Sequence, residues 1–166
     1  MTKAETMDGE DTLAADPAPM FDMIELLYFA YRDFVGDADR LLETYGFGRA
    51  HHRVLHFVAR HPGLTIAELL DILAITKQSL NRVLKELVAQ DFIEARAGAS
   101  DRRQRRLHAT LKGADLALKL ARAQTRRLAA AMQALGPDAR REAAAFLLEM
   151  IDRPARARVL ALIARS

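Results

Sequence analysis

The side chains best suited to chemistry in this sequence gather on one predicted helix. They are Lys77, Gln78, Ser79, Asn81, Arg82 and Lys85. Amide and guanidinium groups match the donors and acceptors of base edges in the major groove of DNA, whereas ammonium and hydroxyl groups suit phosphates. The helix holds no carboxylate before Glu86, although an ordinary solvent-facing helix usually mixes Glu with Lys. The pattern therefore favours a face that contacts a polyanion.

The charge of the chain is unevenly distributed, although its formal net charge is only +3. Residues 1–25 carry seven acids against one lysine, whereas residues 96–127 carry ten basic residues against two acids. A concentrated positive field suits a nucleic acid, because each phosphate that is neutralised releases condensed counterions. The sequence holds no cysteine, which excludes a disulfide scaffold, a cysteine-ligated zinc finger and a thiol redox sensor.

Two helices joined by a tight turn are predicted around the polar face. Thr65 and Glu68 have the spacing of a capping box, which begins a short helix over residues 66–73. After a brief break, Thr76 can cap a longer helix that runs to about Gln90. The apolar stripe of this helix, which we expect to face the core, consists of Leu80, Val83, Leu84, Leu87 and Val88. Such a pair of helices is typical of a helix-turn-helix.

A basic β-hairpin is predicted directly after the longer helix. Residues 92–97 and 105–110 alternate well enough for two strands, and residues 98–100 favour a turn between them. The hairpin carries the basic side chains Arg96, Arg102, Arg103 and Arg105. Arginines of such a wing can enter the minor groove of DNA, where narrow A·T-rich geometry deepens the negative potential.

Long amphipathic helices are predicted on both sides of this unit. The expected helical segments are residues 20–45, 49–60, 111–135 and 138–152, with a break at Pro154 before a last apolar segment. Gly46 and Gly136 supply stops, and Gly36 allows a bend in the first helix. The apolar surface of the outer helices exceeds what a compact winged unit needs, so we expect it to bury against a second copy of the chain.

The predicted fold is mainly α with a small β-hairpin wing. It is a winged helix-turn-helix flanked by long N- and C-terminal dimerisation helices. The expected divisions are a disordered acidic tail at residues 1–18, an N-terminal dimerisation helix at 19–47, a DNA-binding domain at 48–110 and C-terminal dimerisation helices at 111–166.

The order of these elements over residues 20–152 resembles that of the MarR family of bacterial winged-helix transcriptional regulators. The most specific part is the wing signature, which comprises Asp101, Arg102, Arg103, Leu107, Thr110 and Gly113. Ala109 departs from this signature, since the family usually has Leu there. Residues 51–56 and 75–79 are similar to those of PetP-type regulators, a branch of the family.

The resemblance implies a homodimer that places two recognition helices in successive major grooves of a pseudo-palindromic operator. It also implies that the wings reach the flanking minor grooves. By position in the signature, Arg103 would enter the minor groove and Asp101 would orient a neighbouring arginine. Residues 77–82 would read the major groove.

Aromatic residues of the first helix are candidates for the wall of a ligand pocket. They are Tyr28, Phe29, Tyr31 and Phe34. Members of the family often bind small phenolic or other aromatic anions between the dimerisation helices and the winged unit. The alternative is plain core and dimer packing, which is the usual role of aromatic residues at helical spacing.

Two histidines at helical spacing, His52 and His56, could ligate a metal ion with His51 or a distant carboxylate. Nothing in the sequence supplies the remaining ligands, so contact with phosphate, solvent or a partner subunit is the stronger interpretation. We therefore predict neither a metal site nor a cofactor.

The sequence as a whole predicts a homodimeric, cytoplasmic, sequence-specific DNA-binding regulator. We expect a repressor that binds double-stranded DNA and responds to a small aromatic or anionic ligand. Enzymatic activity is not expected, because the sequence has no Gly-rich phosphate loop, nucleophile elbow or metalloprotease motif. No apolar stretch reaches the length of about 20 residues that a membrane span needs. The alternatives are a winged-helix scaffold for protein interactions and a non-specific architectural DNA-binding protein.

Overall fold

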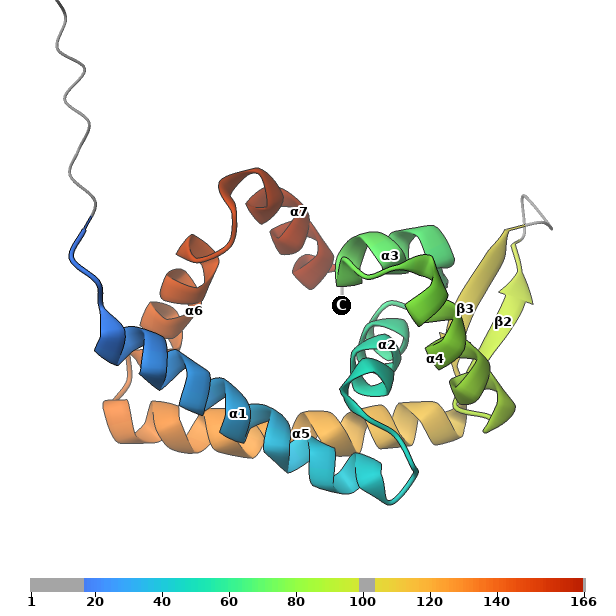
Figure 1. Cartoon of the computed structure of the whole chain (residues 1–166), viewed down its shortest axis with the longest axis horizontal. Coiled ribbons are helices and arrows are strands. Elements are labelled where there is room, and N and C mark those ends of the chain that lie inside the picture. Colours follow the sequence, from blue (N-terminus) through green and yellow to red (C-terminus); the bar gives the residue numbers. More distant parts are fainter. Residues whose placement is uncertain (1–16, 99–103, 166) are drawn as a thin grey trace, which may run out of the picture.

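The computed structural model describes residues 17–98 and 104–165 (Figure 1). Its elements, in chain order, are α1 (Phe21–Glu43), α2 (Arg49–Arg60), β1 (Leu64–Thr65), α3 (Ile66–Leu73), α4 (Lys77–Ala89), β2 (Ile93–Ala97), β3 (Arg105–Ala109), α5 (Leu111–Leu135), α6 (Ala139–Glu149) and α7 (Arg153–Ala164). The predicted fold class is confirmed, since helices dominate and one small sheet forms the wing. None of the helices in the described ranges combines the length and apolar character that crossing a membrane requires.

The helix-turn-helix begins at the predicted capping box. The backbone N–H of Thr65 donates to Glu68 Oε2 over 2.8 Å, and the backbone N–H of Glu68 donates to Thr65 Oγ1 over 3.2 Å. These contacts also lower the pKa of the Glu68 carboxyl, mainly through the hydrogen bond from the Thr65 backbone. Ala74 ends α3 in the left-handed conformation, with φ of 50°, and Thr76 Oγ1 accepts from the backbone N–H of Ser79 to start α4. The two caps therefore set the turn between α3 and α4.

One face of α4 packs into the core. Leu80, Val83, Leu84 and Leu87 are buried there, as the sequence predicts. The prediction for Val88 is wrong, since its side chain is 45% exposed. Val88 lies on the edge of the apolar stripe, beyond the width that the neighbouring elements cover. The next residues along the chain that pack into the core are Phe92 and Ile93, which are buried just after the helix.

The wing is a three-stranded antiparallel sheet in the order β1–β3–β2. The expected two-strand hairpin forms, with Ile93 opposite Ala109 and Ala97 opposite Arg105. The sequence pattern did not predict β1, in which Leu64 pairs with Leu107. A strand of two residues leaves no periodic signal, and Thr65 belongs both to this strand and to the cap of α3. The tip of the wing at residues 99–103 lies outside the described part of the chain.

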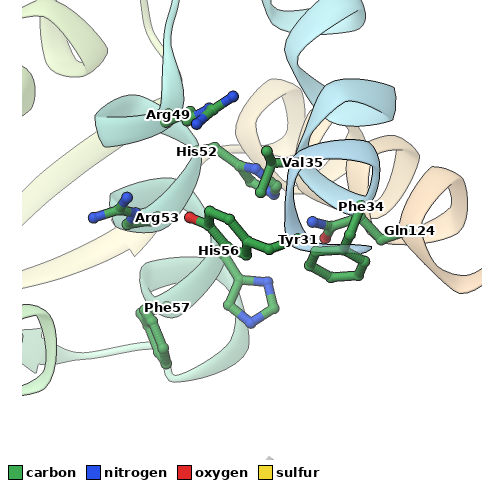
Figure 2. Close-up of a pocket in the computed structure, with 9 residues that line it drawn as sticks. All are labelled: Tyr31, Phe34, Val35, Arg49, His52, Arg53, His56, Phe57 and Gln124. Atoms are coloured by element: carbon green, nitrogen blue, oxygen red, sulfur yellow. The ribbon is translucent and has the colours of Figure 1, made fainter. Parts of the chain in front are cut away.

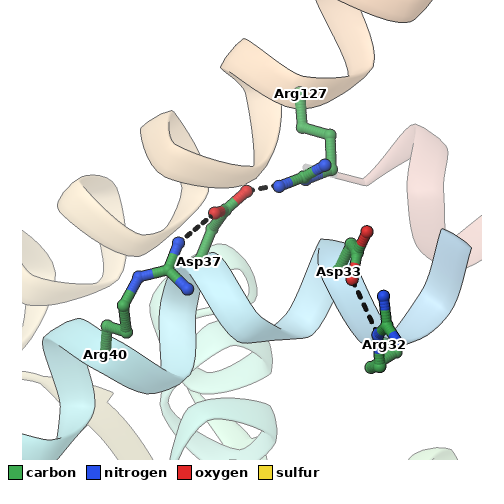
Figure 3. Close-up of polar contacts among 5 residues, drawn as sticks. All are labelled: Arg32, Asp33, Asp37, Arg40 and Arg127. Carbon is green, nitrogen blue, oxygen red and sulfur yellow. Dashed lines mark hydrogen bonds and ion pairs between the residues drawn. The ribbon is translucent and has the colours of Figure 1, made fainter. Parts of the chain in front are cut away.

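Helices α1 and α5 lie side by side (Figure 1). Asp37 of α1 accepts from Arg127 of α5 over 2.7 Å and from Arg40 over 2.6 Å (Figure 3). The contact with Arg127 is the main reason that the pKa of the Asp37 carboxyl is lowered. The helix runs unbroken through Gly36 but ends at Glu43, two residues before the predicted end. A turn with Gly46 at φ of 69° follows.

The C-terminal helices return toward the winged unit. Helix α6 ends at Glu149, before the predicted end at residue 152, and Pro154 occupies the first turn of a separate helix, α7. Arg156 stabilises the turn between α6 and α7, because its guanidinium donates to the backbone oxygens of Ile151 and Glu149. The far end of α7 lies beside α3 (Figure 1). Arg158, in the middle of α7, forms an ion pair with Asp71 of α3.

Candidate DNA-binding surface

The polar residues that the sequence assigns to one helix face are all exposed on α4. They are Lys77, Gln78, Ser79, Asn81, Arg82 and Lys85. The buried stripe of α4 fixes their outward orientation, since the two sets alternate at helical spacing. Ser79 has a second role, because its hydroxyl oxygen lies 2.9 Å from Thr76 Oγ1 within the helix cap. The surface combines groups that can bond base edges with groups that suit phosphates.

A groove joins the start of α4 to the wing. It has a volume of about 370 Å³, and Lys77, Gln104 and Arg105 line it together with residues of β1 and α3. The structure thus brings Lys77 and Arg105, which are far apart in sequence, into the lining of one concave surface. The predicted set did not include Gln104, which lies at the base of the wing tip. The groove is large enough for a phosphate, and its lining includes two cations, Lys77 and Arg105.

Arg96 lies on the other face of the wing. Strand residues alternate between faces, and Arg96 is paired in register with Arg106, whereas Arg105 is paired with Ala97. The guanidinium of Arg96 forms an ion pair with Glu94, and that of Arg106 donates to the Gly63 backbone oxygen over 3.2 Å. The structure therefore separates Arg96 from the groove. Of the remaining predicted site residues, Asp101, Arg102 and Arg103 lie outside the described residues.

A cavity of about 280 Å³ lies between the N-terminal long helix and the winged unit (Figure 2). Its lining residues are Tyr31, Phe34 and Val35 of α1, Arg49, His52, Arg53, His56 and Phe57 of α2, and Gln124 of α5. Of the four aromatic candidates, the structure places Tyr31 and Phe34 in this wall. Tyr28 and Phe29 are exposed on α1 and do not line the cavity.

Two histidines of α2, His52 and His56, line this cavity. Burial lowers the pKa of both His52 and His56. Positive charge on His56 lowers the pKa of His52 further, and the charge of Arg60 lowers the pKa of His56 further. The two rings lie 6.4 Å apart at 85°. Across residues 17–98 and 104–165, no group of three or more His, Asp or Glu side chains is placed to hold a metal ion.

His51 points away from this cavity and toward α4. Its Nε2 lies 2.7 Å from Glu86 Oε2, and its Nδ1 lies 3.1 Å from the backbone nitrogen of Gly48. Both ring nitrogens are thus occupied by hydrogen bonds, which separates His51 from the other two candidate metal ligands, His52 and His56. Spacing along the chain could not reveal the contact with Glu86, because 35 residues separate the two.

The N-terminal half of α1 exposes apolar side chains on every side. The exposed apolar residues there, with Met20 just before the helix, are Met20, Phe21, Met23, Ile24, Leu26, Leu27, Tyr28, Phe29 and Tyr31. Helices α6 and α7 add Phe146, Leu147, Met150, Leu160 and Ile163. A helix that is apolar all round is normally buried, so this surface is typical of an interaction surface.

Comparison with known proteins agrees with this architecture. The MarR family profile matches residues 45–104. The transcriptional regulator PetP of Rhodobacter capsulatus, an HTH-type regulator, is 47% identical over 131 residues, which cover 79% of each chain.

Solved structures have the same fold at lower identity. A MepR mutant from a multidrug-resistant S. aureus isolate has a TM-score of 0.68 and 19% identity, over 80% of this chain and 96% of that one. A cysteine-to-serine mutant of MarR from E. coli, complexed with operator DNA, has a TM-score of 0.62 and 18% identity, over 81% of this chain and all of the other. The chain belongs to the MarR family of winged-helix, DNA-binding transcriptional regulators.

Proposed function

We propose that the protein is a homodimeric repressor that binds a pseudo-palindromic operator and responds to a small ligand. The observation that carries the proposal is the exposed face of α4, which presents amide, guanidinium and ammonium groups and has Glu86 as its one carboxylate. A scaffold for protein interactions has no need of such a face. The relative that was solved with operator DNA supports the same use of the fold.

In the proposed complex, Gln78, Asn81 and Arg82 contact base edges in the major groove. Phosphates are contacted by Lys77, Ser79, Lys85 and Arg96. Wing arginines at positions 102, 103 and 105 enter the minor groove, with Asp101 orienting one of them. The groove lined by Lys77 and Gln104 supports a phosphate-binding site where the recognition helix meets the wing.

The apolar surface of α1, α6 and α7 supports a homodimer. Burying these side chains against a second copy would remove a large apolar area from water, at about 25 cal/mol for each Å². The two recognition helices would then face half-sites about 10 bp apart, centre to centre, which is one turn of DNA. A monomer would leave these side chains in water and would contact only one half-site.

The deciding experiment is an anisotropy titration of the protein against the intergenic DNA upstream of its own gene. A shuffled duplex of equal length is the control, and both are measured at two salt concentrations. We expect a preference of about 10³-fold or more for the upstream DNA, with affinity for both duplexes falling as salt rises. A reporter driven by the same DNA should become more active when the protein is removed.

Two results would overturn this proposal. Equal, salt-sensitive binding to both duplexes would indicate the non-specific architectural alternative. The absence of binding to either duplex would favour a scaffold for protein interactions.

The cavity between α1 and α2 is the proposed effector site. Its aromatic wall suits a flat ring, and Arg53, which also lines it, suits an anionic substituent. Arg49 lines the cavity as well, but its guanidinium forms an ion pair with Asp39 over 2.9 Å. Because the cavity touches α1, α2 and α5, an occupant would change how the winged unit sits on the long helices. That change would alter the spacing of the two recognition helices.

The effector site can be tested with 4-hydroxybenzoate as the probe. We expect it to release the protein from the upstream DNA, and we expect Arg53→Gln to weaken that release. Arg140→Gln is the control, because Arg140 is an exposed arginine of α6 that does not line the cavity. Equal responses of the two variants would contradict the proposed site.

A further inference from the structure

Glu86 is the only carboxylate on α4, and it lies four residues after Arg82. Residues at this spacing are neighbours on a helix surface, so a glutamate and an arginine so placed can form an ion pair. Such a pair would draw the Arg82 guanidinium away from DNA. It would also leave a negative charge beside the surface that must accept phosphates.

The structure directs Glu86 elsewhere. Its Oε2 lies 2.7 Å from Nε2 of His51, a residue of α2. Arg82 is exposed and makes no hydrogen bond or ion pair with any other residue in the described ranges. The guanidinium of Arg82 is thus left free on the outer face of the recognition helix.

His51 is itself held in place on three sides. The backbone N–H of Gly48 donates to Nδ1, so the proton of the neutral ring is on Nε2, where it can be donated to Glu86. The ring stacks on Phe47, with centroids 4.7 Å apart and an angle of 15° between the planes. Phe47 is buried, and the His51 side chain is only 13% exposed. The imidazole therefore reaches α4 in one fixed orientation.

We propose that His51 is a positioning residue for DNA binding, which holds Glu86 away from Arg82 and from the phosphate backbone. Nothing in this role requires His51 to touch DNA. The proposal rests on the proposed contact of Arg82 with DNA. On this proposal, a residue of α2 directly affects which charges the exposed face of α4 presents to DNA.

Two isosteric variants separate this role from a purely structural one. The amide of an asparagine side chain overlays Nδ1 of histidine, so His51→Asn keeps an acceptor for Gly48 but loses the donor to Glu86. The amide of a glutamine overlays Nε2, so His51→Gln keeps the donor to Glu86. If His51 served only to cap α2 by accepting from Gly48, His51→Asn would be the less damaging of the two variants, because it keeps that acceptor.

We expect the opposite order in DNA binding. His51→Asn should weaken binding at low salt by about two- to fivefold, the scale of one exposed ion pair, while His51→Gln stays close to the parent protein. Glu86→Gln should abolish the defect, so that the double variant His51→Asn/Glu86→Gln binds at least as tightly as the parent. Glu142→Gln, which removes an exposed carboxylate of α6, is the control for a change in net charge.

The measurement is an anisotropy titration of each variant on the upstream and shuffled duplexes, with thermal unfolding to establish that each variant is folded. The proposal is overturned if His51→Asn binds like the parent, or if the double variant stays as weak as His51→Asn alone. Equal binding of the parent to both duplexes would refute the sequence-specific function. In that case the ratio of the DNA affinities of the His51→Asn and His51→Gln variants, measured on either duplex, would still decide the role of His51.

Discussion

Arg82 is the side chain on which the proposed base readout depends most. It lies on the outer face of α4, between Gln78 and Lys85, and its charge is not matched by another described residue. Arginine can bond two acceptors of guanine at once, which distinguishes that base from the other three. Lysines and hydroxyl groups on the same helix can neutralise phosphates but cannot discriminate between bases in this way.

Replacing this arginine tests the assignment directly. We expect Arg82→Ala to cost about 1–3 kcal/mol at the operator and much less on a shuffled duplex. The matched control is Arg141→Ala, which removes an exposed arginine of α6 from a surface that is not proposed to contact DNA. Titrations of both variants on both duplexes provide the comparison. Equal losses for Arg82→Ala on the two duplexes would reassign the residue to a phosphate.

The histidines that line the cavity should give stability a dependence on pH. Burial lowers the pKa of His52 and of His56, so between the folded and unfolded pKa values the unfolded chain binds more protons than the folded one. The contribution of these two histidines to stability is then fully present above the unfolded pKa of about 6.5, and it falls as the pH drops below that value. We expect the free energy of unfolding in urea to decrease as the pH is lowered from above this value to below it.

The variant His52→Gln/His56→Gln should reduce the dependence of the free energy of unfolding on pH. His108→Gln is the comparison, because His108 is a histidine of β3 that does not line the cavity. A slope that survives in the double variant would show that other groups cause the acid sensitivity.

At the scale of elements, two glycines have opposite roles in their helices. Gly113 lies in the first turn of α5, where a Cβ would come 1.9 Å from the backbone oxygen of Phe92. The same oxygen accepts from the backbone N–H of Thr110, which caps α5. Gly36 lies within α1, where a Cβ would have the end of the Arg40 side chain as its nearest neighbour, at 3.9 Å. Close packing requires the first glycine, whereas no contact within the described chain requires the second.

Alanine at each position should therefore change stability in opposite directions. Gly113→Ala must move the backbone of Phe92 or α5 and should cost about 1–3 kcal/mol or more. Gly36→Ala gains helix propensity and should add about 0.5–1 kcal/mol. Denaturant unfolding of both variants measures the two effects. A loss in Gly36→Ala as large as that in Gly113→Ala would indicate that α1 is in close contact with a second copy at this residue.

At the scale of the whole molecule, the long helices form an open arrangement that presents much apolar surface. Helix α1 lies along α5, and α6 and α7 return from the far end of α5 to reach α3 (Figure 1). The ion pair between Arg158 and Asp71 connects the last helix to the first helix of the helix-turn-helix. A dimer formed through α1, α6 and α7 would therefore be linked to the position of the winged unit from two sides, through α2 and through α7.

The dimer surface can be tested by placing charges within it. We expect Ile24→Glu/Leu27→Glu to produce a monomer in light scattering after size-exclusion chromatography, because two carboxylates would be buried without partners. The same variant should lose the preference for DNA with two half-sites over DNA with one. Leu111→Glu is the matched control, since Leu111 is an apolar residue with 94% exposure that lies at the start of α5 beside the wing. A dimeric Ile24→Glu/Leu27→Glu protein would contradict the assignment of this surface.

Features that depend on a few neighbouring residues could be predicted from the sequence. The bounds of α2 and α5 agree at both ends with the prediction, and the caps at Thr65 and Thr76 form as expected. Helical periodicity also predicts which face of α4 carries the polar set. Such features are local because a helix hydrogen bond or cap joins residues only three or four positions apart.

Only the tertiary structure decided which distant residues meet. The pairing of Leu64 with Leu107, the exposure of Val88 and the contact between His51 and Glu86 all depend on how separate elements pack. The same is true of the groove between Lys77 and Arg105, and of the cavity that includes Tyr31 and Phe34 but not Tyr28 and Phe29. Spacing along a helix or strand determines which residues share a face, whereas the packing of that face determines what it contacts.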